Sequence, residues 1–157
     1  MIRVADYIAD FVYRQGVKDV FMLSGGGSIY LDDGIACHKH LNPICVRNEA
    51  TAPMMAEAYA RLTGNLGVAF VTTGPGGANA VSGVAEAWVD SAPILVISGQ
   101  VQRSQTTYNA KIENLRTFGM QELNIIEVVD SITKYAVMVN DPNSIRYHLE
   151  KAVYLAK

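Results

Sequence analysis

Glu49 follows a short apolar run, Ile44-Cys45-Val46, and stands directly before a segment with helical periodicity. A carboxylate at the start of a helix commonly does no more than complement the helix dipole. At the carboxyl edge of a sheet, however, a carboxyl placed among Ala50, Met54 and Met55 would be poorly hydrated. Poor hydration favours the neutral carboxyl, which can donate a hydrogen bond. The residue types alone leave both interpretations of Glu49 open.

A glycine-rich turn, Gly74-Pro75-Gly76-Gly77-Ala78-Asn79, follows another apolar run and opens another helix. This context suits anion binding at a helix N-terminus. Asn79 stands where the dinucleotide fingerprint has its third glycine, and no Lys-Ser or Lys-Thr pair of a P-loop follows. The turn is therefore either a tight strand-to-helix connection or a ligand site that uses neither nucleotide motif.

The run Cys37-His38-Lys39-His40 offers three metal-ligand types within four residues. No second cluster completes a tetrahedral site, and in a helix His38 and His40 would not share a face. We therefore predict no metal site here, and we interpret the run as cationic residues at a helix end.

The elements that must position these residues alternate between apolar runs and amphipathic segments. We predict strands over 19–23, 43–46, 67–72, 93–98 and 135–139. We predict helices that begin at Val4 and end near Gly16, and over 29–40, 49–63, 77–90, 123–129 and 142–156, with a polar, partly helical segment over 103–120. Continuous apolar strands indicate a parallel sheet flanked by helices on both faces, which is an α/β fold whose ligands bind beyond the carboxyl ends of the strands.

The composition is that of one ordinary globular domain over residues 1–157. A net charge of −2 gives no reason to expect nucleic acid or a membrane as partner. No apolar run is long enough to span a bilayer, and the first residues do not resemble a signal peptide. Cys37 and Cys45 form no CxxC motif, so we expect a reduced, cytoplasmic setting.

Taken together, several motifs in order resemble the acetolactate synthase branch of the thiamine-diphosphate-dependent enzymes. They are Arg47-Asn48-Glu49, Ala56-Glu57-Ala58-Tyr59-Ala60-Arg61-Leu62-Thr63-Gly64, Thr72-Thr73 with the glycine-rich turn, Asp90-Ser91-Ala92-Pro93, Ile97-Ser98-Gly99-Gln100-Val101, Gln121-Glu122 and Ser131-Ile132-Thr133-Lys134. The resemblance covers essentially the whole chain. It implies the N-terminal, pyrimidine-binding domain of such an enzyme, with a six-stranded parallel sheet whose sixth strand this chain does not reach.

The resemblance also implies a function and its residues. In the family, the glutamate that matches Glu49 hydrogen-bonds a nitrogen of the cofactor's pyrimidine ring and promotes loss of the thiazolium C2 proton. A 2-keto acid is then decarboxylated, and its acyl unit is transferred or released. Cofactor-binding positions match Glu49, Gly25, Gly26, Thr73, Gly74, Asn79 and Gln100, and positions that line the substrate channel match Gln121 and Lys134. Ser91 matches a position near FAD in the members that carry FAD.

The family implies partners that this chain does not supply. Mg²⁺ is held by a further domain with a Gly-Asp-Gly motif, which is absent here, so we expect a fragment of a longer enzyme that is inactive alone. The cofactor lies between subunits, which implies a homodimer or homotetramer. The helix after Ala50 would contribute its apolar side chains to that contact, namely Met54, Met55, Ala58 and Tyr59.

The chain departs from the family pattern near the expected substrate site. Asn48 replaces a histidine, Gln102 replaces a proline, and the stretch from Gln102 to Gln121 is longer than usual. These departures predict a specialised keto acid or acceptor. Two alternatives stay open: a separate pyrimidine-domain subunit of a split decarboxylase of the sulfopyruvate or phosphonopyruvate type, and a non-catalytic module with the same fold.

Overall fold

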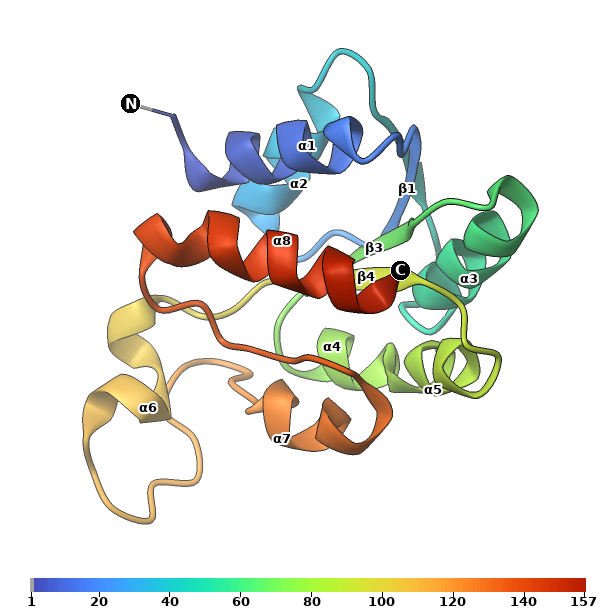
Figure 1. Cartoon of the computed structure of the whole chain (residues 1–157). Coiled ribbons are helices and arrows are strands. Elements are labelled where there is room, and N and C mark those ends of the chain that lie inside the picture. The colour runs from blue at the N-terminus through green and yellow to red at the C-terminus, as the bar shows by residue number, and fades with distance from the viewer. Residues whose placement is uncertain (1) are drawn as a thin grey trace.

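The computed structural model of this chain describes residues 2–157 and contains one parallel sheet. Its strands are β1 (Asp19–Met22), β2 (Asn42–Cys45), β3 (Gly67–Val71) and β4 (Ile94–Ser98). They lie in the order β2-β1-β3-β4, and every neighbouring pair is parallel. This confirms the predicted α/β fold with a parallel sheet (Figure 1).

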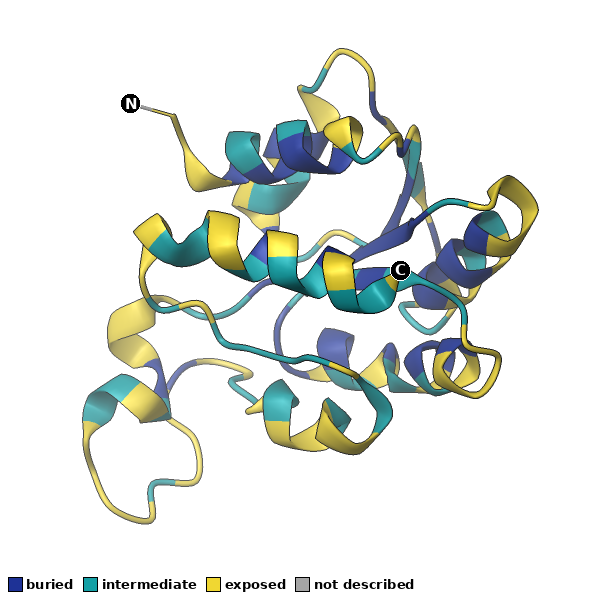
Figure 2. Cartoon of the chain, viewed as in Figure 1, coloured by how far each residue is buried: buried dark blue, intermediate teal, exposed yellow. Residues whose placement is uncertain are grey.

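Helices cover both faces of the sheet. They are α1 (Val4–Arg14), α2 (Ile29–Ala36), α3 (Thr51–Thr63), α4 (Pro75–Asn79), α5 (Val81–Val89), α6 (Thr107–Ala110), α7 (Ile125–Val129) and α8 (Ile145–Ala156), with 3-10 turns η1 (Arg103–Gln105), η2 (Asp130–Ile132) and η3 (Pro142–Ser144). Buried side chains concentrate where the helices meet the sheet (Figure 2).

Alternation along the strands divides the core into two layers. Val20 and Met22 of β1 pack in one layer with residues of α1, α2 and α8, whereas Phe21 points to the other face. There it meets Ala52 and Ala56 of α3. The helix lies so close to the sheet that a Cβ on Gly67 would be 1.9 Å from the carbonyl oxygen of Ala56. A glycine is therefore required where β3 begins.

The strand predicted over 135–139 is wrong. The segment pairs with no strand among the described residues. It is held against α8 instead: the hydroxyl of Tyr135 and Nδ1 of His148 lie 2.6 Å apart, and Nζ of Lys151 lies 4.4 Å from the centre of the Tyr135 ring. These side-chain contacts take the place of a backbone ladder.

Several predicted helices have different ends. The helix predicted over 29–40 ends at Ala36, because His38 and His40 both pack on the ring of Tyr13, at centroid distances of 5.3 and 5.0 Å. Two residues on opposite faces of a continuing helix could not do so. The helix predicted over 77–90 begins earlier, at Pro75, and is divided at Ala80 into α4 and α5.

The described residues contain neither a membrane-spanning helix nor a cluster of metal ligands. No helix in this part of the chain is long and apolar enough to cross a bilayer. Residues 2–157 bring no three histidine, cysteine, aspartate or glutamate side chains together as a metal site.

Candidate functional site

The turns that follow the strands interlock at one edge of the sheet. The amide of Gly27, after β1, donates a hydrogen bond to Oγ1 of Thr72, after β3, at 3.1 Å. A Cβ on Gly99, after β4, would be 2.2 Å from the carbonyl oxygen of Gly27. The turns after β1, β3 and β4 are therefore in direct contact, as expected for the carboxyl edge of a parallel sheet.

Glu49 belongs to the turn between β2 and α3, because α3 begins at Thr51. Its carboxylate is half-buried, and Oε2 accepts a hydrogen bond from Nδ2 of Asn79 at 2.7 Å. Asn79 is the last residue of α4. The two residues that the sequence singled out separately, one in each motif, are thus joined in one site.

Asn48 holds this pair from the other side. Its Oδ1 accepts from the amide of Ala50 at 2.9 Å and from Nδ2 of Asn79 at 3.2 Å. Asn48 therefore fixes the turn and orients Asn79. Sequence reasoning missed this role, although an asparagine that bonds to the amide two residues on is a known turn pattern.

The surroundings of the Glu49 carboxyl differ from the expected methionine pocket. Met55 packs into the core beneath the sheet, and Met54 lies on the exposed side of α3. A Cβ on Gly76 would lie 3.5 Å from Oε1 of Glu49 and 2.5 Å from Cγ2 of Thr72. The carboxyl therefore faces an asparagine amide and the backbone of the glycine-rich turn.

Gly74 adopts φ 60° and ψ −120°, a conformation that favours glycine, and it touches the later part of the chain. A Cβ at this position would be 1.9 Å from the carbonyl oxygen of Gln121. Its neighbour Thr73 donates to Oε1 of Gln100 at 2.6 Å, and Nε2 of Gln100 reaches the carbonyl of Leu123 at 3.4 Å. The predicted residues Thr73, Gly74, Gln100 and Gln121 therefore lie together.

The turn after β1 combines open backbone with a buried carboxylate. A Cβ on Gly26 would meet nothing within 4 Å, whereas one on Gly25 would collide with Thr72. Asp32 accepts from Oγ of Ser28 at 2.9 Å, and its Oδ1 is buried without a partner. Burial raises the pKa of Asp32, although hydrogen bonds from Ser28 and Gly25 oppose the increase. Sequence reasoning missed Asp32, which a serine four residues earlier at the helix start could have indicated.

Lys134 lies apart from this group. Its Nζ donates to the carbonyl of Leu155 at 2.9 Å, in the last turn of α8, where a lysine suits the helix dipole. The role of Lys134 in a substrate channel stays a prediction.

Comparison with known proteins identifies the family. Residues 2–128 match the family described as "Thiamine pyrophosphate enzyme, N-terminal TPP binding domain". The chain belongs to this family. This TPP-binding domain is 36% identical over 152 residues to "Acetolactate synthase, chloroplastic" of Arabidopsis thaliana, covering 97% of the chain and 21% of that protein. It is 35% identical over 156 residues to "Acetolactate synthase isozyme 3 large subunit" of Escherichia coli (strain K12), covering 99% of the chain and 26% of that protein.

The TPP-binding domain thus spans about a fifth to a quarter of the length of these relatives. The relatives confirm the resemblance to acetolactate synthases and do not favour a split decarboxylase or a non-catalytic module.

The described residues fit the pyrimidine part of the cofactor. The carboxyl of Glu49 lies at the meeting point of the turns, where Gly76 keeps the backbone free of side-chain atoms. Gly26 leaves open space beside the turn after β1. A flat, polar ring needs an anchoring carboxyl and close approach to backbone, and this edge of the TPP-binding domain offers both.

Proposed function

We propose that this domain binds and activates the aminopyrimidine ring of thiamine diphosphate in an acetolactate synthase-like enzyme. That enzyme would decarboxylate a 2-keto acid and transfer or release the acyl unit. The observation that carries the proposal is the hydrogen bond between Asn79 and Glu49 at the edge where the strand ends meet. When bound, thiamine diphosphate supplies the electron sink for decarboxylation, while the protein supplies orientation and proton control.

Each residue of the site would have a distinct task. Glu49 would hydrogen-bond a nitrogen of the pyrimidine ring and hold the proton that this nitrogen needs. Asn79 holds Oε2 of Glu49 and so orients the carboxyl toward Gly76. Thr73 and Gln100, which are hydrogen-bonded to each other, would form the adjoining wall.

The proposal is tested by Glu49→Gln in the enzyme that carries this domain. Glutamine is nearly isosteric and keeps a hydrogen bond, but it cannot transfer a proton to the ring nitrogen. Positioned proton transfer contributes about 10²–10⁴-fold, so exchange of the thiazolium C2 proton, followed by NMR in deuterated water, should fall by that order. The melting temperature should change little, because a carboxylate at a helix start contributes about 0.3–1 kcal/mol through the dipole.

A matched control is Glu86→Gln, which changes an exposed residue of α5. It should leave both exchange and stability unchanged. Undiminished C2 exchange in Glu49→Gln would remove Glu49 from the mechanism and with it the proposed function.

We further propose the partners that the family implies. Mg²⁺ would be held by another domain of the longer enzyme, and the setting would be cytoplasmic. FAD is a further candidate cofactor, because Ser91 matches a position near FAD in the members that carry it. The free, exposed thiols of Cys37 and Cys45 suit a reducing compartment. Because no Gly-Asp-Gly motif occurs in residues 1–157, we expect calorimetry to show no tight binding of thiamine diphosphate and Mg²⁺ by this chain alone. Submicromolar binding would contradict that expectation.

We propose a homodimer or homotetramer that uses the outer side of α3. Met54, Ala58 and Leu62 are exposed there, and Leu62 is 88% exposed. Trp88 and Val89 are exposed on α5, which packs against α3. Met55 and Tyr59, which we expected in the same contact, are turned toward the domain's own core. Homodimer interfaces are more apolar than ordinary surface, which supports this face.

For the substrate, we propose a keto acid or acceptor other than that of housekeeping acetolactate synthesis. Asn48 supports this because it occupies the histidine position and contacts Asn79 directly. The long segment up to Gln121 supports it because it touches the Gly74 turn. A panel of 2-keto acids tests the proposal. Fast conversion of pyruvate to acetolactate, with no other substrate preferred, would contradict it.

A further inference from the structure

The segment 103–121 is folded around a single carboxylate. Oε1 of Glu122 accepts hydrogen bonds from the amide and the hydroxyl of Thr107, at 2.6 and 2.8 Å. Oε2 accepts from the amides of Phe118 and Gly119, at 3.0 and 3.4 Å. Hydrogen bonds to an ionised acceptor are stronger than neutral ones. One side chain therefore ties the beginning of the segment to its end.

Few apolar contacts hold this segment. Between residues 103 and 121, only Thr106 and Gly119 are buried. The large apolar side chains of the segment are exposed instead: Tyr108, Ile112, Phe118 and Met120. A segment with few buried apolar contacts opens easily. Its conformation therefore depends on hydrogen bonds and on the packing of Gly119 against Val101 and Gln105. The hydrogen bonds to Glu122 join the two ends of the segment.

The carboxylate also sits beside a strained backbone position at the candidate site. Gln121, the preceding residue, has φ 60°, and its carbonyl oxygen lies against Gly74. A non-glycine residue keeps such a conformation only when its surroundings hold it. The surroundings here are the bonds of Glu122 on one side and the contact of Gln100 with the carbonyl of Leu123 on the other.

The same carboxylate shapes a cleft. Glu122 and Thr107 line a cavity of about 650 Å³, together with Asn124 and Met138. The long segment contributes Thr107 and Tyr108 to the lining, and the extended stretch around Met138 contributes Ala136 and Val137. Loss of the hydrogen bonds to Glu122 would therefore move Gln121 and would also change the lining of this cleft.

We propose that Glu122 is a positioning residue, whose carboxylate closes the 103–121 segment and thereby presents Gln121 and the cleft wall to the substrate. The role of Gln121 and the cleft wall toward the substrate rests on the proposed function, whereas the closure of the segment is a property of this chain itself. The hydrogen bonds of Glu122 go to Thr107, Phe118 and Gly119 of this segment, so its role is positioning rather than catalytic.

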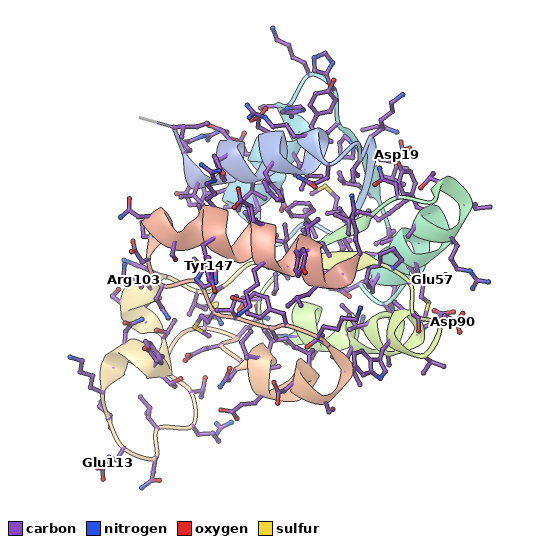
Figure 3. All side chains as sticks on the ribbon, viewed as in Figure 1. Asp19, Glu57, Asp90, Arg103, Glu113 and Tyr147 are labelled. Atoms are coloured by element: carbon purple, nitrogen blue, oxygen red, sulfur yellow. The ribbon has the colours of Figure 1, made fainter. Side chains whose placement is uncertain are left out.

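The closure is tested on this chain by limited digestion with trypsin. Lys111 and Arg116 are exposed cleavage sites within the segment. Glu122→Gln replaces two acceptor oxygens by one acceptor and one donor group, so cleavage at these sites should become about tenfold faster or more. The control is Glu113→Gln on the same segment, where Figure 3 shows Glu113 at the tip, directed away from the domain. Its cleavage should stay within about twofold of the wild type.

The digestion has two results that would overturn the closure. One is an unchanged rate at Lys111 and Arg116 in Glu122→Gln. The other is an equal increase at Arg14 of α1, because that would indicate general destabilisation rather than opening of one segment. Mass spectrometry of the fragments distinguishes these cases.

The positioning role is tested in the enzyme that carries this domain. Glu122→Gln should leave thiazolium C2 exchange within about twofold of the wild type, because Glu49 and Asn79 are not touched. It should lower kcat/KM for the substrates about tenfold or more, mainly through KM, and Glu122→Asp should recover part of the loss. An equal fall in C2 exchange would overturn the positioning role. A wild-type enzyme without C2 exchange would refute the proposed function, while the digestion result would stand.

Discussion

The side-chain amide of Asn79 donates a hydrogen bond to Oε2 of Glu49 at 2.7 Å, across 30 residues of sequence. Because the same amide lies 3.2 Å from Oδ1 of Asn48, one side chain of α4 contacts two consecutive residues of the turn before α3. Asn79 of α4 therefore sets the position of the Glu49 carboxyl, and a substitution of Asn79 should displace that carboxyl.

We expect Asn79→Asp to impair cofactor activation. The substitution removes the Nδ2 donor that holds Oε2 of Glu49, so the carboxyl is no longer oriented. Exchange of the thiazolium C2 proton in the longer enzyme should fall at least about tenfold, since positioned proton transfer is worth about 10²–10⁴-fold.

The control for this variant is Asn124→Asp, since Nδ2 of Asn124 donates to Oε1 of Glu127 at 2.6 Å in a second, exposed asparagine–glutamate pair. Both variants should lose a similar, small stability of about 1 kcal/mol or less. Only Asn79→Asp should change C2 exchange, and equal effects of the two variants would show that the pairing at Glu49 has no special role.

Gly74 and Gly26 should respond differently to alanine. In Gly74→Ala, the new Cβ would collide with the carbonyl of Gln121 at a backbone conformation with φ 60°, so we expect a loss of at least about 2 kcal/mol. Gly26→Ala meets nothing within 4 Å and should stay within about 0.5 kcal/mol of the wild type. Denaturant unfolding of this chain measures the change in stability of each variant. In the longer enzyme, Gly26→Ala should weaken cofactor binding without loss of stability, if the open space beside Gly26 receives the ring.

Glu122 should make the stability of the chain depend on pH in the acid range. Burial by itself would raise the pKa of Glu122, but hydrogen bonds from Thr107, Phe118 and Gly119 outweigh it and lower the pKa. A carboxyl whose pKa is lower in the folded state stabilises the fold above its unfolded pKa. The stabilisation by the ionised Glu122 carboxyl should therefore be complete above about pH 4.5. It should disappear as the pH falls through the lower pKa that Glu122 has in the folded chain. The measurement is the unfolding free energy of wild type minus that of Glu122→Gln, and a difference that does not change with pH would contradict this account.

The proposed subunit contact should be sensitive to charge on the outer side of α3. Leu62→Glu would place a carboxylate at a position that is 88% exposed in this domain and would be buried between subunits. Sedimentation of the longer enzyme should then shift toward the monomer. Tyr154→Glu is a matched control, because Tyr154 is 82% exposed on α8, which packs in the other core layer from α3. Equal sedimentation of both variants and the wild type would exclude this face.

The sequence by itself determined the layers of the fold and the edge that carries the site. Runs such as Val68-Ala69-Phe70-Val71 are apolar at every position, and only a strand covered on both faces buries all of them. Parallel strands place their carboxyl ends together, so Glu49 and the glycine-rich turn could be assigned to one edge without a structure. These conclusions follow from local patterns, because burial and chain direction repeat along each element.

Only the tertiary structure decided which side chains meet. The extended stretch at Tyr135 packs on α8 instead of joining the sheet, a choice between two partners that no local pattern encodes. Likewise, Met55 packs against the core, while Asn79 of α4 lies beside Glu49. Glu122 gathers donors that lie up to 15 residues away. Each of these contacts depends on the distance between separate elements, and that distance is set by the packing of the whole domain.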